Sequence, residues 1–164
     1  SGYNSLVVIN ENVNGKWSQV ENQLQRRADL IPNLVDTVKG FAAQETEVFT
    51  ALANARAALA GAGTVSETAE ANQEITSALG RLIAIAEAYP ELKSNTNFLA
   101  LQDELAGTEN RIATARMDYN TAVQSYNTKV KSLPTALYAR LLGFSEREYF
   151  EARDGAEDGV DVDF

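Results

Sequence analysis

The sequence predicts an all-α protein: an antiparallel four-helix bundle followed by a short C-terminal helix and an extended tail. Three observations lead to this prediction. Only three prolines and ten glycines occur among 164 residues, which favours long helices over many short strands. Apolar residues recur every three or four positions in four stretches. Broken at its turn signals, the chain gives stretches of about 25, 28, 23 and 38 residues, which suit a bundle with short loops.

The first helical stretch carries one apolar stripe and ends in the segment QRRADLIPNL at 25–34. The stripe comprises Leu6, Ile9, Val13, Trp17, Val20 and Leu24. Joined to the next stripe, it would form a helix of roughly fifty residues or more, about 80 Å long. Pro32 suits the first turn of a new helix, and Asp29 before it suits a helix N-terminus. We therefore predict a corner here, with one kinked helix as the alternative.

Two further helical stretches follow the predicted corner. The second stripe comprises Val38, Phe41, Glu45, Val48, Leu52, Ala55 and Leu59, and the third comprises Ile75, Leu79, Leu82, Ala86 and Tyr89. Between them, the segment GAGTVSET at 61–68 holds two glycines and then Ser66 and Thr68. This composition predicts a helix stop, a loop and an N-cap. Pro90 disfavours helix at the preceding residue, so the third helix should end there.

The longest stripe precedes the C-terminal segments. It comprises Phe98, Leu101, Leu105, Thr108, Ile112, Ala115, Tyr119, Ala122, Tyr126 and Val130, and Pro134 should close or bend the helix. The segment ALYARLLGF predicts a short helix with Gly143 at its C-cap, and SEREYFEA is compatible with one more turn. We assign residues 1–150 to the bundle and 151–164 to an acidic tail, in which Val160, Val162 and Phe164 alternate as in an extended segment.

Composition excludes several function classes. The chain has no cysteine and no histidine, which removes thiol nucleophiles, Ser-His-Asp triads and the usual transition-metal ligands. The net charge is −9, and no basic stripe is present to contact nucleic-acid phosphates. The tail acids lack calcium-loop spacing, and no apolar run approaches the ~20 residues of a membrane-spanning helix. We predict no enzymatic activity, no cofactor, no metal and no nucleic-acid partner.

Four runs carry a resemblance to a known family. They are KWSQVENQLQRRADLIPNLVDTVKGFA, ENRIATARMDYNTAVQSYN, SLPTALYARLLGF and EYFEA, and together they resemble the LemA family over nearly the whole chain. The resemblance implies a helical-bundle domain held at the cell membrane by one N-terminal transmembrane helix, expected just before Tyr3 and outside this sequence. It also implies a body on the cytoplasmic side and membrane-protein partners such as a membrane metalloprotease. The molecular function of the family is not defined.

The predicted corner is our candidate interaction surface, formed by Arg26, Arg27, Asp29 and Asn33. Two fixed cations next to a helix N-terminus suit an anionic group. The simpler interpretation, which we favour, is a helix end with surface ion pairs.

Two other features combine polar groups with apolar stripes. Glu45 lies on one stripe, and Glu109 and Arg111 lie beside another. A buried acid needs a partner, so we expect interhelix ion pairs rather than a carboxylate site. The triplet YNT occurs at 119–121 and again at 126–128. Core packing of the rings is the favoured interpretation, and an aromatic and amide ledge for a partner is the alternative.

Two functional hypotheses follow. The first is a non-catalytic interaction or scaffold domain tethered to a membrane. The second is a ligand-binding or hydrolytic protein that uses carboxylates and arginines in a bundle pocket. The regular bundle pattern and the missing catalytic residue types favour the first.

Overall fold

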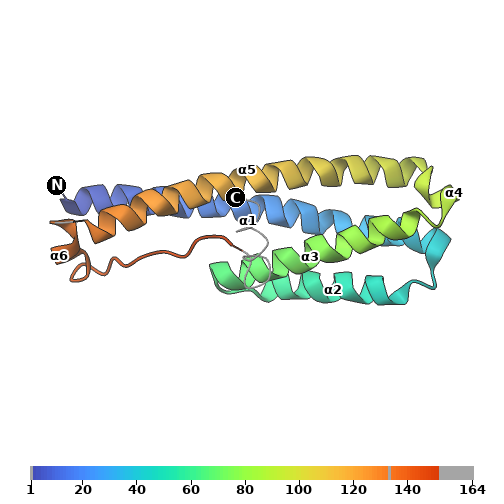
Figure 1. Cartoon of the computed structure of the whole chain (residues 1–164), viewed down its shortest axis with the longest axis horizontal. Coiled ribbons are helices and arrows are strands. Elements are labelled where there is room, and N and C mark those ends of the chain that lie inside the picture. The colour runs from blue at the N-terminus through green and yellow to red at the C-terminus, as the bar shows by residue number, and fades with distance from the viewer. Residues whose placement is uncertain (1, 133, 152–164) are drawn as a thin grey trace, which may run out of the picture. The chain divides into compact units, whose positions relative to one another are not determined.

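The computed structural model describes residues 2–132 and 134–151. These residues form helices and turns but no strand, so the all-α prediction is confirmed (Figure 1). The elements are α1 (Gly2–Ala42), α2 (Thr46–Gly61), α3 (Val65–Ala86), α4 (Pro90–Lys93), α5 (Thr96–Lys131) and α6 (Thr135–Ala139). Within the described residues, no helix is long and apolar enough to cross a membrane. The alternating residues of the predicted tail lie outside the described part of the chain.

The predicted corner at Asp29–Pro32 is wrong, because α1 continues through Pro32 to Ala42. A proline inside a helix removes one backbone hydrogen bond and costs about 3 kcal/mol. Pro32 itself is exposed, while Ile31, Leu34 and Val38 are buried on one face of α1. Each of these side chains contributes roughly 1.5–3 kcal/mol on burial, which offsets the cost of the proline. The chain reverses after Ala42 instead, where Glu45 N donates to Ala42 O at 3.0 Å.

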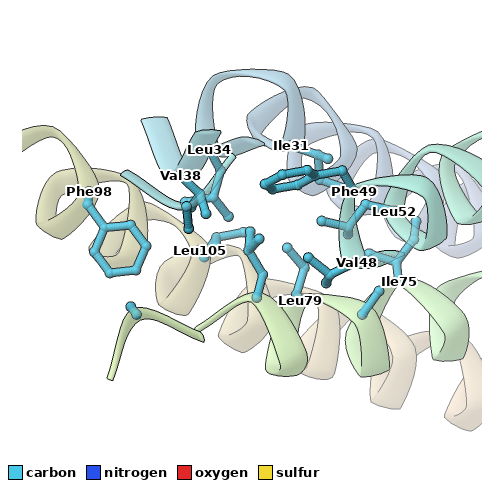
Figure 2. Packing of buried hydrophobic residues seen from close by; sticks show 14 of the residues in the cluster. Ile31, Leu34, Val38, Val48, Phe49, Leu52, Ile75, Leu79, Phe98 and Leu105 are labelled. Atoms are coloured by element: carbon cyan, nitrogen blue, oxygen red, sulfur yellow. The ribbon is translucent and has the colours of Figure 1, made fainter. Parts of the chain in front are cut away.

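The described residues fall into two compact units. Unit 2 contains the second half of α1 from Leu24, then α2, α3, α4 and the first part of α5 to Asn110. Its four long helical segments run antiparallel in chain order (Figure 1). Hydrophobic side chains from all four converge in one core, which contains the aromatic rings of Phe49 and Phe98 beside aliphatic groups (Figure 2).

Two caps inside unit 2 set the starts of helices. Thr64 caps α3, because its side chain accepts a hydrogen bond from Glu67 N at 3.0 Å. The Glu67 carboxylate accepts in return from Gly63 N at 2.8 Å. This reciprocal arrangement is a capping-box variant, and it starts the helix before Ser66, where we had expected the loop to continue. Asn95 caps α5 by accepting from Phe98 N at 3.0 Å.

Unit 1 contains the first part of α1 to Gln23 and the chain from Arg111 to Phe150. The predicted short helix is present as α6, and Gly143 follows it with a φ of 86°. Gly143 N donates to Arg140 O and Phe144 N donates to Ala139 O, at 3.2 and 2.9 Å. These two bonds form a Schellman motif, which needs a left-handed residue at the position of the glycine. The further turn with which SEREYFEA is compatible is not formed in its described residues, because residues 144–151 are not helical.

Candidate interaction surfaces

Arg27 lies inside unit 2 rather than at a surface corner. It is only 3% exposed. Its guanidinium donates to Thr76 Oγ1 at 2.9 Å, to Asn72 O at 3.1 Å and to Asn72 Oδ1. Burial lowers the pKa of Arg27 below its ordinary value, and the charge of Glu109 acts in the opposite direction. Arg27 therefore joins α1 to α3, and its donors are directed at neutral oxygens of α3.

The other residues of the predicted surface lie on the opposite face of α1. Arg26, Asp29 and Asn33 are all exposed, and their spacing of three and four places them on one side of a helix. Asp29 accepts from Gln25 Nε2 at 2.7 Å. The helix N-terminus that was expected to help bind an anion is missing, because α1 is continuous. That these three side chains contact a partner stays a prediction.

Among the residues that the structure describes, Glu45 forms a hydrogen bond in place of the expected interhelix ion pair. Its carboxylate accepts a hydrogen bond from Tyr89 Oη at 3.3 Å, and Gln44 Nε2 donates to the same hydroxyl. The pKa of Tyr89 is raised by loss of solvation and then by the nearby charge of Glu45. This half-buried acid is therefore satisfied by a phenol rather than by a cation.

The repeated YNT triplets hold an extended segment, residues 144–150, against α5. Asn120 Oδ1 accepts from Phe150 N at 2.8 Å, and Asn120 Nδ2 donates to Phe150 O at 3.3 Å. One heptad later, Asn127 makes the same pair of bonds with Arg147 N and Arg147 O, at 2.8 and 3.0 Å. We call residues 144–150 the strap, and Asn120 and Asn127 the asparagine clamp.

The repeat of seven on α5 matches a repeat of three on the strap. Seven helical residues advance about 10.5 Å at ~1.5 Å each. Three extended residues advance about 10 Å at ~3.3 Å each. Asn120 and Asn127 therefore meet the strap at Phe150 and Arg147, which are three residues apart. The strap runs antiparallel to α5, since the earlier asparagine binds the later strap residue.

The two tyrosines of the triplets lie in the core of unit 1, as the favoured interpretation predicted. Tyr119 and Tyr126 are 0% and 2% exposed. Tyr119 Oη donates to Glu148 O at 2.8 Å. Burial raises the pKa of both tyrosines, and the positive charge of Arg147 acts in the opposite direction. The rings thus pack as core residues while the adjacent amides bind main chain.

Arg147 and Phe150 give the strap its side-chain contacts with α1. Arg147 Nη1 donates to Asn10 Oδ1 and to Asn14 Oδ1, both at 2.9 Å. Phe150 is 1% exposed, and its ring centroid lies 5.7 Å from that of Trp17. Our sequence reasoning missed both residues as contacts. The signal was present in the asparagines, which recur at a spacing of four on α1 and of seven on α5.

An acidic groove lies between α2 and α3. It has a volume of about 230 Å³ and is lined by Ala58, Gly61, Ala62, Glu67, Glu70, Ala71 and Glu74. Arg27 is not among these residues, so the groove does not combine carboxylates with the buried arginine. Within the described part of the chain, no three acidic side chains are arranged to hold a metal ion.

Comparison with known proteins identifies relatives over most of this chain. Two curated proteins of Paramagnetospirillum magneticum, magnetosome proteins MamQ 1 and MamQ 2, are each 29% identical to it. Magnetosome protein MamQ of Magnetospirillum gryphiswaldense is 27% identical. Each alignment covers 94% of this chain and 66% of the relative, so the chain spans slightly less than two thirds of those proteins. The model of the LemA family matches residues 16–164. This chain therefore belongs to the LemA family.

Proposed function

We propose that this chain is a non-catalytic interaction module of a membrane-associated protein, and that unit 1 binds an extended peptide backbone along α5. Membership of the LemA family and the similarity to MamQ proteins support the membrane association and the non-catalytic role. The observation that carries the peptide-binding part is the asparagine clamp, which bonds both polar main-chain groups of Arg147 and of Phe150.

The clamp suits a peptide because it forms hydrogen bonds with main-chain groups. A carboxamide presents one acceptor and a donor group side by side, which match the N–H and C=O of an extended residue. Main-chain bonds of this type supply affinity in strand-like peptide recognition, while side-chain contacts supply specificity. Here Asn10 and Asn14 accept from a guanidinium, and Trp17 packs against an aromatic ring. The chemistry therefore selects an extended segment with a basic residue three positions before an aromatic one.

The strap is the resident occupant of this site. A partner would present a segment of the same chemistry and exchange with residues 144–150. In the membrane-held protein we propose that the partner is another membrane protein, such as a membrane metalloprotease.

We also propose that a single transmembrane helix upstream of Tyr3 anchors the protein and that the module lies on the cytoplasmic side. Protease accessibility of the anchored protein in sealed, right-side-out vesicles tests the side, since a cytoplasmic module is then protected.

Peptide binding can be tested with the strap sequence supplied in trans. The double variant Arg147→Ala, Phe150→Ala weakens the resident strap while leaving the clamp intact. A fluorescent peptide FSEREYFE should bind this variant more tightly than the unmodified chain, measured by fluorescence anisotropy. Methylation of the peptide nitrogens at the positions of Arg147 and Phe150 removes both N–H donors to the clamp. That peptide should lose most of its affinity.

The matched control peptide is methylated at the positions of Glu148 and Tyr149. The main-chain nitrogens that donate to the clamp are those of Arg147 and Phe150, so this peptide should bind nearly as well as the unmodified one. Equal weakening by both methylation patterns, or no binding of any peptide, would reject the proposed site. The anchored Asn120→Ala and Asn127→Ala variants should each capture less of their partners from detergent-solubilised membranes than the unmodified anchored protein does.

A further inference from the structure

One end of unit 1 exposes several large aliphatic side chains. Leu137, Leu141 and Leu142, on α6 and the turn after it, are 72%, 86% and 44% exposed. On the surface of a soluble protein such residues usually occur singly, and a local group of them indicates an interaction site. Three leucines within six positions form such a group.

The start of α1 belongs to the same end. Tyr3 is 51% exposed, and its ring meets the edge of Phe144 with 6.2 Å between centroids. Gly2 lies directly against the Tyr138 hydroxyl, so that a side chain at Gly2 would collide with it. We call Tyr3, Leu137, Leu141 and Leu142 the apolar end of unit 1.

The charge around the apolar end is positive, although the chain as a whole is acidic. The sequence has no Asp or Glu from residue 119 to residue 145, while Lys129, Lys131 and Arg140 lie in that interval. Glu146 follows and pairs with Lys131 at 3.5 Å. Residues 1–10 carry no charged side chain. Unit 1 holds seven basic and five acidic residues, a net charge of +2, against −9 for the whole chain.

We infer that the apolar end is a contact surface for an anionic phospholipid bilayer. The three leucines protrude from a short helix and its turn, a shape that enters the boundary between headgroups and acyl chains. Lys129, in the last turn of α5, and Arg140, at the C-cap of α6, attract anionic headgroups and place their charges in water while their stems remain in the apolar layer. A second copy that met this surface through its own apolar end would bring the +2 charge of its unit 1, which has the same sign as the surface, whereas an anionic bilayer supplies the opposite sign.

This inference rests on the proposed membrane association and adds the face by which the module lies on the bilayer. It does not depend on the peptide site. The two proposals are therefore tested separately, because lipid binding is measured without a peptide and peptide binding is measured without lipid.

Vesicle binding of the full chain tests the surface. Vesicles of phosphatidylcholine with about one third phosphatidylglycerol should sediment the protein, and pure phosphatidylcholine should bind it much more weakly. Because the chain has no cysteine, a single Leu141→Cys substitution can carry an environment-sensitive dye. Its emission should shift to the blue on the anionic vesicles. The same dye at Met117→Cys, an exposed site (63%) on the middle of α5, should show no shift.

Substitutions then identify the side chains responsible. The triple variant Leu137→Ser, Leu141→Ser, Leu142→Ser should partition at least about tenfold more weakly, and Lys129→Gln with Arg140→Gln should remove the preference for anionic lipid. Met117→Ser should bind as the unmodified chain does. A helical circular dichroism spectrum and an unchanged Tm establish that each variant is folded. Absence of vesicle binding, or binding that the triple variant retains, overturns the inference. A change in solution mass instead of lipid binding would assign the surface to a second copy.

Discussion

The two units are built on the same two helices, α1 and α5, but different chemistry holds each one together. In unit 2 these helices pack with α2 and α3 around aliphatic side chains. In unit 1 their companion is a non-helical strap, whose main-chain groups need partners that a helix would have supplied internally. Asparagines and a tyrosine hydroxyl supply several of them. The comparison shows that one heptad pattern on α5 can pack either against other helices or against an extended segment.

Removing an aliphatic side chain from unit 2 should have the largest effect. Leu34 is fully buried in the core of this unit. Leu34→Ala removes transfer free energy and leaves a cavity, so unfolding should become easier by about 2–5 kcal/mol. Urea denaturation followed by circular dichroism measures the change. Leu99→Ala, at an exposed position of α5 (46%), is the control and should cost much less. Similar losses at the two sites would contradict the core assignment.

Arg26 and Arg27 provide a second contrast, between neighbouring residues on opposite faces of α1. Arg27→Gln leaves Thr76 and Asn72 without their donors, and should cost about 1–3 kcal/mol of unfolding free energy. Arg26→Gln changes an exposed charge and should stay within about 0.5 kcal/mol. Thermal or urea unfolding of the two single variants measures both values. If Arg27→Gln were as mild as Arg26→Gln, the buried position of Arg27 would be in doubt.

The clamp should give a smaller and more local effect. Asn127→Ala removes two hydrogen bonds to Arg147, each with a net contribution of about 1 kcal/mol. We expect hydrogen exchange to accelerate in residues 144–150, while the amides of α2 and α3 keep their protection. Thr128→Ala, at the exposed neighbouring position, should leave both regions unchanged. Uniform acceleration across the chain would show that the strap is not an independent element.

The fold was predictable where one signal dominated, and less so where two competed. The apolar stripes on α1, α3 and α5 were predicted from spacing, and so was the short helix before Gly143. Its predicted cap is displaced, because the C-cap of α6 is Arg140 and Gly143 takes its positive φ in the turn that follows. The prediction of a corner at Pro32 was wrong because it considered only the local chemistry of proline. The buried apolar stripe that continues on both sides of Pro32 was not taken into account. The capping residue of α3 was also misplaced, since the N-cap is Thr64, two residues before Ser66, and Glu67 makes the reciprocal bond.

The candidate surfaces were only partly predictable for a different physical reason. The YNT repeat was visible in the sequence, but its occupant depends on where the chain goes after Gly143. Main-chain recognition by a side-chain amide leaves no pattern in the bound segment, because any residue except proline presents the same groups. Arg147 and Phe150 therefore became recognisable as contacts only once the strap was seen beside Asn120 and Asn127.

The smallest expected effect is a pH dependence specific to unit 1. Burial raises the pKa of Tyr119 above its ordinary value, whereas an unfolded tyrosine titrates near pH 10. Above that pH the unfolded chain loses the proton more readily than the folded one, so this contribution to stability is complete below pH 10 and falls as the pH rises. The loss cannot exceed about 1.4 kcal/mol per pH unit for one tyrosine.

Tyr119→Phe separates this titration from general alkaline effects. It abolishes the ionisable group together with its bond to Glu148 O, so the variant should be less stable at pH 8 but should lose less further stability between pH 10 and 11. Tyr149→Phe, on the partly exposed side of the strap (38%), is the matched control and should keep the slope of the unmodified chain. Urea unfolding followed by the fluorescence of Trp17, whose ring packs at a tilt against that of Tyr119 with 5.1 Å between ring centroids, reports on unit 1 directly. If Tyr119→Phe and Tyr149→Phe had the same alkaline slope, Tyr119 would not be the buried phenol on which the packing of unit 1 depends.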